Sequence, residues 1–348
     1  MRPHRRWLRP FVRVSGWAYL GFVIATVLAL RFVGERFWLT GMALYVPRIV
    51  FLAPVIVLLV LGVALRLSRV LWTQLAASLL VWFPLMGFVL PSPRASATGT
   101  QVRVFSLNVN SIVMGDQALA DRIAHYDPDV IMLQELGSNW HWIADRLRET
   151  YPAVHVSGQF LLASRYPLLS SREPGRFELN ERSRTERFMR YELDTPIGPV
   201  AFYNMHPLSP RWAFYAMRGM RVRTSLKNGT IMRGGAAEES MRENFDVRER
   251  QLAAVAQRAA ADEIPQVLGG DTNLPGLSPI VARHLSEFSD GFASAGWGFG
   301  YTFPSRVPWM RIDRVFVSRA LRVTSFQVGC DEDSDHRCVV ASIERAAE

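Results

Sequence analysis

Cysteine is scarce in this chain, whose 348 residues include only two, Cys330 and Cys338. Two cysteines are too few for a disulfide-dense secreted scaffold, and they do not make a structural zinc site. Two interpretations stay open: a single disulfide in an oxidising compartment, or two small buried thiols. The pair flanks the stretch Ser334-Asp335-His336. Whether the two cysteines form a disulfide therefore affects the loop that carries this aspartate and histidine.

Other signatures are missing as well. The chain has no Gly-rich phosphate loop of the Walker type, no visible internal repeat, and no histidine–cysteine cluster with zinc-like spacing. Acidic residues are nearly missing from residues 1–99, which carry 11 Arg and one acid, Glu35. The net charge of +9 therefore belongs to this third, because residues 100–348 carry 29 Lys+Arg against 30 Asp+Glu. A near-neutral remainder argues against a broad duplex-binding face.

Three long apolar runs fill the same N-terminal part: Val14–Leu30, Ile49–Leu65 and Val70–Leu90. Each approaches the ~20 residues that cross ~30 Å of hydrocarbon. A cleavable signal peptide explains one such run and not three. A buried helical subdomain fits less well, because the runs lack a charged face. We expect residues 1–90 to form an all-α membrane anchor of three transmembrane helices.

The arginines indicate the orientation of this anchor. Five of them lie in the N-terminal tail, and Arg66 and Arg69 separate the second and third runs. Both groups are typical of the cytoplasmic side. Three crossings then place everything after Leu90 outside the cytoplasm, in a protein of the cytoplasmic membrane. A Pro/Ser/Ala/Gly linker at 91–100 joins the anchor to a domain at 101–348, which we expect close to the lipid headgroups.

Residues 101–348 alternate β-branched strands with amphipathic helices. The predicted strands are 101–108, 130–133, 160–164, 187–193, 200–204, 266–268, 312–317, 323–328 and 338–343, and the predicted helices are 118–125, 139–150 and 247–261. The alternation is loose, and a hairpin joins the fourth and fifth strands. This pattern favours an α/β sandwich of two packed sheets with helices outside over a doubly wound parallel sheet.

Polar side chains stand where these strands begin or end, and a sandwich gathers such positions along one rim. Glu135 and Asp335 are hard oxygen ligands suited to Mg²⁺ or Mn²⁺. Asp271 and Asn273 together can polarise a water molecule. At the end of the first strand, Asn108 is favoured over its neighbour Asn110 by the alternation of the strand.

Two histidines complete this candidate site. His336, held by a carboxylate such as Asp313, can bind or protonate a phosphoryl oxygen, and His206 can do the same from the opposite side. Taken alone, Asp313 is better explained as a surface carboxylate at a strand start. Arg187 and Arg190 are candidates for binding the phosphate of a substrate.

Six short motifs occur in the order found in one known group of enzymes. They are Ser106-Leu-Asn108, Leu133-Gln-Glu135, Asn204-Met-His206, Gly270-Asp-Thr-Asn273, Arg311-Ile-Asp313 and Ser334-Asp-His336. Each is weak alone, but the ordered set resembles the endonuclease/exonuclease/phosphatase superfamily, which has the DNase I-like fold. The resemblance spans residues 101–344. It implies a four-layer α/β/β/α sandwich and divalent-metal hydrolysis of phosphate esters.

The resemblance also implies roles for the site residues. Glu135 would be the principal metal ligand, with Asn108 and Asp335 beside the metal, and Mg²⁺ or Mn²⁺ would be the cofactor. In the same way Asp271 and Asn273 would align or activate the attacking water. His336, oriented by Asp313, would contact the scissile phosphate, and His206 would lie on the leaving-group side. Metal charge and positioned donors would then stabilise the pentavalent transition state.

Features outside the six motifs bear on the substrate. Three spans before the domain, and the stretch Gly296–Pro304, resemble small bacterial membrane-bound members, including teicoplanin-resistance proteins. The segment 210–235 is basic and aromatic, carries Arg211 near its start, and follows His206 closely. It can bind to an anionic lipid surface, bind a phosphate headgroup, or bind single-stranded nucleic acid. A mobile, solvated insertion is the plain alternative.

The sequence therefore predicts a membrane-anchored, metal-dependent phosphoesterase that acts outside the cytoplasm on a membrane-associated lipid phosphate or pyrophosphate. A membrane-tethered nuclease is the alternative, and a degenerate, non-enzymatic member is disfavoured by the complete set of site residues. The expected partners are the lipid bilayer and a phosphate-containing substrate. No obligate protein partner is inferred.

Overall fold

The computed structural model describes residues 4–90, 98–110, 116–137, 140–211, 213–214, 235–330 and 334–347. The chain divides into two compact units. One contains Met1–Val89 together with Gly276–Pro279, and the other contains Leu90–Pro275 together with Ile280–Glu348. Most of the basic segment 210–235 lies outside the described residues.

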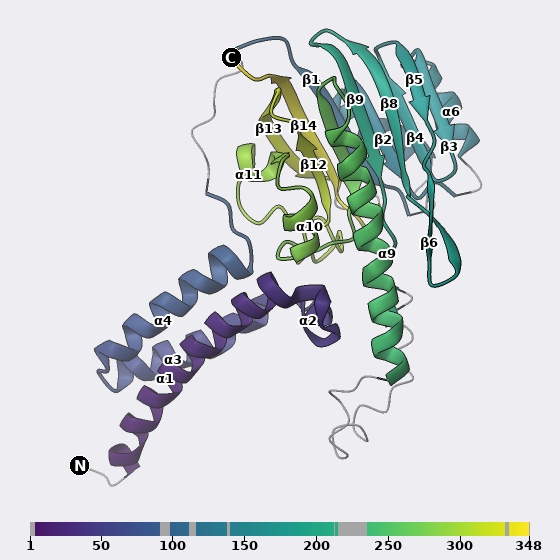
Figure 1. Cartoon of the computed structure of the whole chain (residues 1–348). Helices are drawn as coiled ribbons and strands as arrows, with labels where there is room; N and C mark the ends of the chain where they lie inside the picture. The colour runs from purple at the N-terminus through teal and green to yellow at the C-terminus, as the bar shows by residue number, and fades with distance from the viewer. Residues whose placement is uncertain are drawn as a thin grey trace. The chain divides into compact units, whose positions relative to one another are not determined.

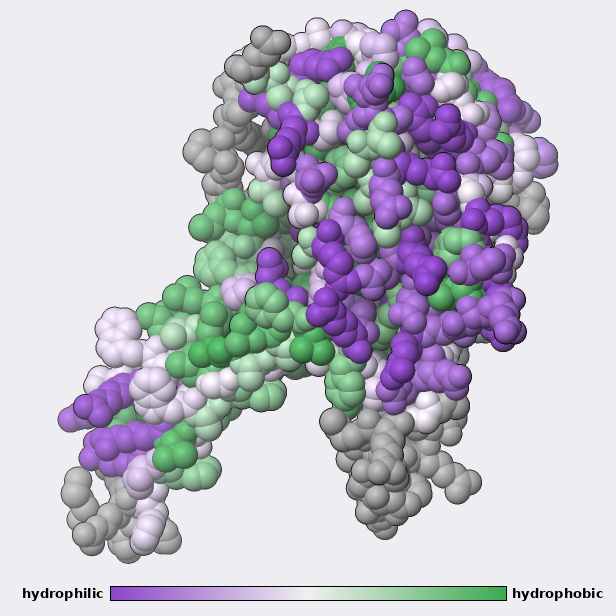
Figure 2. Space-filling view, in the orientation of Figure 1, coloured by the Kyte–Doolittle hydropathy of each residue, from purple (hydrophilic) through white to green (hydrophobic). Residues whose placement is uncertain are grey.

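The first unit is helical. Its α-helices are α1 (His4–Leu28), α2 (Trp38–Ala43), α3 (Leu52–Ala64) and α4 (Ser68–Leu80). Their buried contact joins Val12, Leu58, Leu67 and Val70. Many large apolar side chains of the unit stay exposed, and Figure 2 shows hydrophobic surface gathered over these helices.

Of the three expected spans, one meets the length and composition needed to cross a membrane among the residues that the structure describes. It is the helical stretch Trp7–Arg36, near the N-terminus. Arg48–Ala64 is a shorter apolar helix. The third run forms α4, which has 13 residues. A short π-helix at Val81–Leu85, which contains Pro84, follows it directly. Proline has no N–H to donate to the helix ladder, which accounts for the irregular end.

The second unit contains two six-stranded mixed sheets (Figure 1). The first sheet has the order β13 (Leu321–Gly329), β14 (Cys338–Arg345), β1 (Val102–Asn108), β2 (Val130–Gln134), β4 (Phe160–Ser164), β3 (Ala153–Ser157). The second has the order β11 (Ser289–Asp290), β12 (Asp313–Val317), β10 (Gln266–Asp271), β9 (Gly198–Met205), β8 (Phe188–Thr195), β5 (Leu168–Arg172). A separate ribbon pairs β6 (Arg176–Leu179) with β7 (Arg182–Thr185).

Strand alternation builds three apolar layers from these sheets. In β1, Val104 points into the core between the sheets, while Phe105 points outward against α5 (Asp116–Tyr126) and α6 (His141–Arg148). On the other side, Tyr203 of β9 packs under the helices α9 (Gly235–Ala260) and α10 (Pro279–His284). A short helix, α11 (Gly291–Ala295), precedes β12. The predicted four-layer α/β/β/α sandwich is confirmed, and Figure 1 shows α9 crossing the outer face of the second sheet.

The two cysteines are joined by a disulfide, which settles the choice left open by the sequence. Cys330 directly follows β13, and Cys338 begins β14. These strands form the expected antiparallel hairpin, with Gly329 opposite Cys338. The disulfide therefore closes the base of the loop that carries Asp335 and His336.

Candidate active site

Two parallel strand pairs bring the first four site residues together. β1 runs parallel to β2 with Asn108 opposite Gln134, so Asn108 and Glu135 leave the first sheet at the same edge. β9 runs parallel to β10 with Met205 opposite Gly270, so His206 and Asp271 leave the second sheet in the same way. Parallel neighbours end at a common edge, and the two packed sheets place both edges side by side. This arrangement carries residues from distant segments into one cluster.

The last two site residues arrive on antiparallel strands. Asp313 begins β12 and lies opposite Asp271 in the pairing with β10. His336 precedes β14, which pairs antiparallel with β1. Strand starts are therefore placed beside strand ends. The Ser334 hydroxyl donates to the Asn108 carbonyl at 2.8 Å, which holds the His336 loop against the end of β1.

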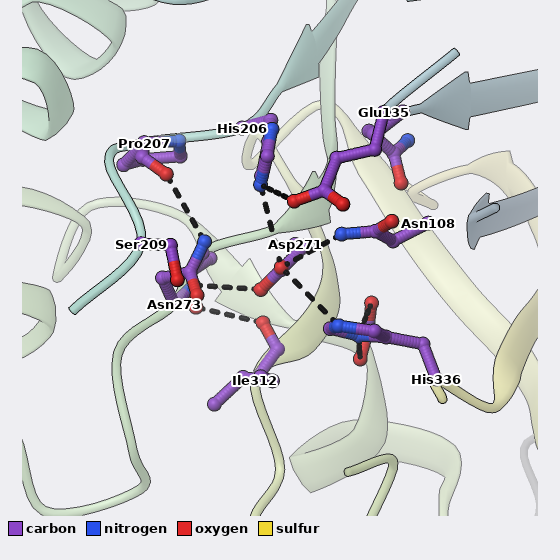
Figure 3. A network of polar contacts seen from close by, with 12 residues as sticks. Asn108, Glu135, His206, Pro207, Ser209, Asp271, Asn273, Ile312 and His336 are labelled. Carbon is purple, nitrogen blue, oxygen red and sulfur yellow. Dashed lines mark hydrogen bonds and ion pairs between the residues drawn. The ribbon is translucent and has the colours of Figure 1, made fainter. Parts of the chain in front are cut away.

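Asp271 lies at the centre of the cluster and is almost fully buried (Figure 3). Its Oδ2 accepts from Asn108 Nδ2 at 3.1 Å, and its Oδ1 accepts from the backbone N–H of Asn273 at 2.7 Å. Asn273 Nδ2 in turn donates to the Pro207 carbonyl at 3.0 Å. These bonds fix the carboxylate between the two sheets.

His206 faces two carboxylates. Its Nε2 lies 3.1 Å from Glu135 Oε1 and 3.6 Å from Asp271 Oδ2 (Figure 3), yet it makes no well-formed hydrogen bond to either. Its Nδ1 lies 2.6 Å from Oε1 of Gln159 and 3.3 Å from Nη2 of Arg187. Because an amide oxygen only accepts, the shorter contact assigns a proton to Nδ1 and turns Nε2 toward the acidic side of the site.

His336 is held by Asp313. Its Nδ1 lies 3.1 and 3.0 Å from the two carboxylate oxygens, so Nδ1–H donates to Asp313. Its Nε2 points to Asp271 Oδ2 at 3.7 Å and to Asp335 Oδ1 at 4.0 Å. Its ring contacts the tilted ring of Phe303, with 4.8 Å between ring centroids. The ring thus has one defined orientation, with Nε2 toward the acidic cluster.

The charges in the cluster shift each other's pKa values. Burial works to raise the pKa of Glu135, but the close contact with His206 and the charges of His206 and His336 prevail and lower it to about 2. Burial raises the pKa of Asp271, with the neighbouring His336 opposing this effect. For His336, burial works against protonation, but Asp313 and Asp271 raise the pKa to about 10. Glu135 is therefore a stable anion at neutral pH, whereas Asp271 holds a proton more readily than a free aspartate does.

Backbone geometry at the site is unusual. Glu135, Arg187 and Asn273 all have positive φ, at 56°, 56° and 53°. Such values are uncommon outside glycine, and they cluster at functional sites where the surroundings hold them. Gly270, at φ 132°, is required for a steric reason, since a Cβ there would lie 2.0 Å from the Met205 carbonyl oxygen.

The structure brings Arg187 to the site but not Arg190. The Arg187 guanidinium contacts Gln159 and His206, and burial lowers its pKa, while Glu135 and Asp271 raise it. Arg190 instead binds Asp262, with Nε 2.8 Å and Nη2 3.0 Å from its carboxylate oxygens. Strand alternation explains the difference, because Arg190 shares its face of β8 with Phe188, under α9.

Asp335 and Arg211 lie at the rim. The Asp335 side chain is 32% exposed, and its Oδ2 lies 3.4 Å from Nη2 of Arg211, itself half-exposed. Arg211, which belongs to the basic segment 210–235, therefore contacts the rim of the site.

Residues that no motif identified also belong to this site. Gln159 contacts His206 from the turn between β3 and β4, and Thr302 and Phe303 contact the Asp313–His336 pair. The Gly158-Gln159 pair marks a tight turn in the sequence, but nothing there indicates that the turn faces His206. Thr302 and Phe303 lie in the stretch Gly296–Pro304, which the sequence linked to a family branch and not to a role.

Two sets of groups in the cluster fit a divalent metal. One is the buried trio Asp271, Asp313 and His336, whose ligand atoms lie within 4.8 Å of one another. In that trio, however, both oxygens of Asp313 already contact His336, which uses Asp313 to orient the ring. The other set is the pair Glu135 and Asp335. These carboxylates remain partly open to solvent, as a catalytic metal position requires.

Comparison with known proteins places this geometry in a family. The family model described as "Endonuclease/Exonuclease/phosphatase family" matches residues 105–336. No curated protein sequence matches the chain. Among solved structures, an endonuclease/exonuclease/phosphatase from Beutenbergia cavernae is 17% identical, with a TM-score of 0.50 and 72% of each chain covered.

Two further structures give the same result. Truncated Caenorhabditis elegans TDP2 is 19% identical, with a TM-score of 0.51, 71% of this chain covered and 98% of the other. The endonuclease/exonuclease/phosphatase from Bacteroides vulgatus is 17% identical, with a TM-score of 0.51, 71% of this chain covered and 100% of the other. At these identities the likeness shows the fold alone. Since the family model covers well over half of the sequence, the chain belongs to the endonuclease/exonuclease/phosphatase family.

Proposed function

We propose that this protein is a membrane-anchored, divalent-metal-dependent phosphoesterase that hydrolyses a phosphate ester or pyrophosphate of a membrane-associated lipid outside the cytoplasm. Family members are hydrolases of phosphoester bonds. The observation that carries the proposal is the convergence of both sheets on one cluster. Asn108, His206 and His336 all face Asp271 there, at 3.1, 3.6 and 3.7 Å.

In the proposal, Glu135, Asn108 and Asp335 hold Mg²⁺ or Mn²⁺. When bound, the ion supplies positive charge for the phosphoryl oxygens. Oxygen donors are the preferred ligands of both ions. Glu135, whose pKa is about 2, remains an anion and needs no deprotonation before binding. Asp335 extends the same acidic patch to the rim, where the substrate phosphate enters.

The remaining residues serve the hydrolysis itself. Asp271, kept in place by Asn108 and Asn273, accepts a hydrogen bond from the attacking water and turns its lone pair toward phosphorus. His336, oriented by Asp313, donates from Nε2 to a non-bridging phosphoryl oxygen. As the water oxygen bonds to phosphorus, the bond to the leaving oxygen breaks. Asp271 takes the proton that the water loses, and His206, placed on the side where the leaving oxygen departs, donates a proton to that oxygen.

Three features support a membrane-associated substrate. The stretch Trp7–Arg36 has the length and composition of a membrane span, and large apolar side chains of the helical unit are exposed. We therefore propose residues 1–90 as the anchor, 91–100 as the linker and 101–348 as the catalytic domain. The disulfide at Cys330 and Cys338 suits an oxidising compartment.

The third feature belongs to a segment that contacts the site through Thr302 and Ser305. Trp297 and Val307 are 69% and 72% exposed, and both belong to the segment 296–310 that packs on the catalytic loop. Exposed apolar side chains on a segment that also contacts the site suit an amphiphilic substrate, whose phosphate enters the cluster while its apolar part stays outside.

A phosphate-release screen tests the proposal. Full-length protein in detergent or proteoliposomes is assayed with Mg²⁺ or Mn²⁺ against a polyprenyl pyrophosphate, a phospholipid, and single- and double-stranded DNA. We expect release from a lipid substrate, and loss of that release after chelation and in the His336→Ala variant. Cleavage of DNA with no release from any lipid would instead support the tethered nuclease.

Topology needs its own test. A periplasm-active reporter and a cytoplasm-active reporter are each fused after Glu348. Activity of the periplasmic reporter alone is expected, and activity of the cytoplasmic reporter alone would refute the proposed orientation without affecting the proposed chemistry.

A further inference from the structure

The hydrogen-bonded pair of Asp313 and His336 joins the two sheets. Asp313 begins β12 in the second sheet, whereas His336 precedes β14 in the first. The distance between the two side chains therefore depends on how the sheets are fixed to each other at this edge. A shift of the sheets by a fraction of an ångström would change the Nδ1–carboxylate contacts of 3.0 and 3.1 Å.

We propose that Thr302 is the positioning residue that sets the placement of His336 relative to Asp313. The proposal rests on the proposed function for the reaction that the pair serves. Thr302 is fully buried and lies outside all named strands. Its hydrogen bonds go to the backbone of Ile312, Asp313 and Arg337 and not to the carboxylate of Asp313 or the imidazole of His336, so its effect is exerted through the backbone.

Thr302 bonds to the backbone on both sides of the pair. Its Oγ1 accepts from the backbone N–H of Asp313 at 3.1 Å and from that of Ile312 at 3.2 Å. Its carbonyl oxygen accepts from the backbone N–H of Arg337, the residue after His336, at 2.8 Å. One residue thus holds the start of β12 with its side chain and the catalytic loop with its main chain.

A short hairpin keeps Thr302 itself in place. Thr302 N–H donates to the Met310 carbonyl at 2.8 Å, and Phe303 and Met310 exchange two backbone bonds of 3.0 Å each. Next in the chain, the Phe303 ring packs on the His336 imidazole. Ser305 N–H donates to the Asp335 carbonyl at 2.8 Å. Thr302 therefore belongs to a hydrogen-bonded hairpin segment that also contacts His336 and Asp335.

Substitution of the Thr302 side chain can remove its two hydrogen bonds while keeping its packing. Valine has nearly the same shape, but it leaves the N–H groups of Ile312 and Asp313 buried without this acceptor. The start of β12 then relaxes, and Asp313 moves with it. A misplacement of about 1 Å in a catalytic group lowers the rate by about 100-fold. Serine keeps the acceptor oxygen and should restore the contact.

The test compares full-length Thr302→Val, Thr302→Ser and Thr195→Val with the wild type. Thr195 is a matched control, because it is also buried and its hydroxyl bonds the backbone of Gly198 and Ile197, in the β8–β9 turn. We expect Thr302→Val to lower kcat by about 10- to 100-fold with KM within about threefold. Thr302→Ser should regain most of kcat, and Thr195→Val should keep it. Thr302→Ala, which leaves room for water, replaces the valine variant if that protein does not fold.

A spectroscopic readout separates this proposal from the proposed function. The low-field proton resonance of His336 Nδ1–H, assigned by its loss in His336→Ala, reports the contact with Asp313 without any substrate. We expect Thr302→Val to shift or remove this resonance and Thr195→Val to leave it unchanged. If the wild type hydrolyses none of the substrates and this pattern is still found, the positioning role stands and the proposed function fails. A Thr302→Val protein that keeps the resonance, whatever its kcat, overturns the positioning role.

Discussion

Cys330 and Cys338 are joined by a disulfide across the paired ends of β13 and β14, and the loop between them carries Asp335 and His336. Both cysteines are buried, so the bond lies in the core between the first sheet and its helices. The catalytic loop is therefore held by a covalent link at its base, by Ser334 at the end of β1, and by Thr302 from the segment that precedes β12.

Removal of the disulfide should destabilise the catalytic unit. In the chain-entropy model, closing a loop of this length stabilises by about 2–3 kcal/mol. We expect Cys330→Ala/Cys338→Ala to melt at a lower temperature in differential scanning and to lose activity at temperatures where the wild type is stable. Dithiothreitol should bring the wild type to the same level and leave the double variant unchanged. Equal melting temperatures without reductant would show that the bond contributes little.

Glu135→Gln should abolish most of the activity while preserving the fold. The change keeps the size of the side chain but removes a carboxylate that is ionised at every working pH, its pKa being about 2. We expect kcat/KM to fall by at least about 100-fold. Binding of Mn²⁺, followed by electron paramagnetic resonance, should weaken in parallel.

Glu178→Gln provides the control for this charge removal, since Glu178 is exposed on β6 and away from the cluster. It should behave as the wild type in both measurements. Unchanged Mn²⁺ binding by Glu135→Gln would exclude Glu135 as a principal ligand.

Arg187 and Arg190 should respond differently to the same substitution. Arg187→Gln removes a cation that contacts Gln159 and His206, so we expect kcat/KM to fall by about 10- to 100-fold with a nearly unchanged melting temperature. Arg190→Gln leaves Asp262 without its bidentate partner, so we expect a loss of about 1–2 kcal/mol in stability and near-normal kinetics. Equal kinetic losses in both variants would contradict this assignment.

The fold was predictable where strands are buried on both faces. β1, β2, β4 and β14 are continuous apolar or alternating runs, and each lies where the sequence predicted it. β3 and β5 were missed because they are edge strands, and β5 is mostly exposed, so no buried face imposes a pattern on either.

The site was predictable as a set of residues but not as a geometry. The ends of strands pointed to Asn108, Glu135 and Asp271, because a strand end needs only its own sequence to be recognised. Arg190, by contrast, was a candidate for binding phosphate with no strand end to support it, and its face of β8 is decided by the register with β9. Gln159 and Thr302 could not be found at all, since their partners come from other segments and no local pattern marks such contacts.

Asp290 should control part of the acid stability of the catalytic unit. Burial works to raise the pKa of Asp290, but Arg311 and Arg314 lower it to about 2, through contacts of 2.7 and 3.2 Å. A pKa that is lower in the folded protein than its value of ~3.9 in an unfolded chain stabilises the fold above that value. The stabilisation, roughly 2–3 kcal/mol, is lost as the pH falls toward 2. Asp290→Asn should therefore melt at a lower temperature than the wild type at pH 6, and the difference should shrink steadily below pH ~4.

Scanning calorimetry over this pH range measures the effect of Asp290→Asn, with the variant Asp194→Asn at an exposed position as control. A difference that stays constant with pH would mean that Asp290 acts by capping α11, where its side chain accepts from Phe292 N–H, and not by its charge.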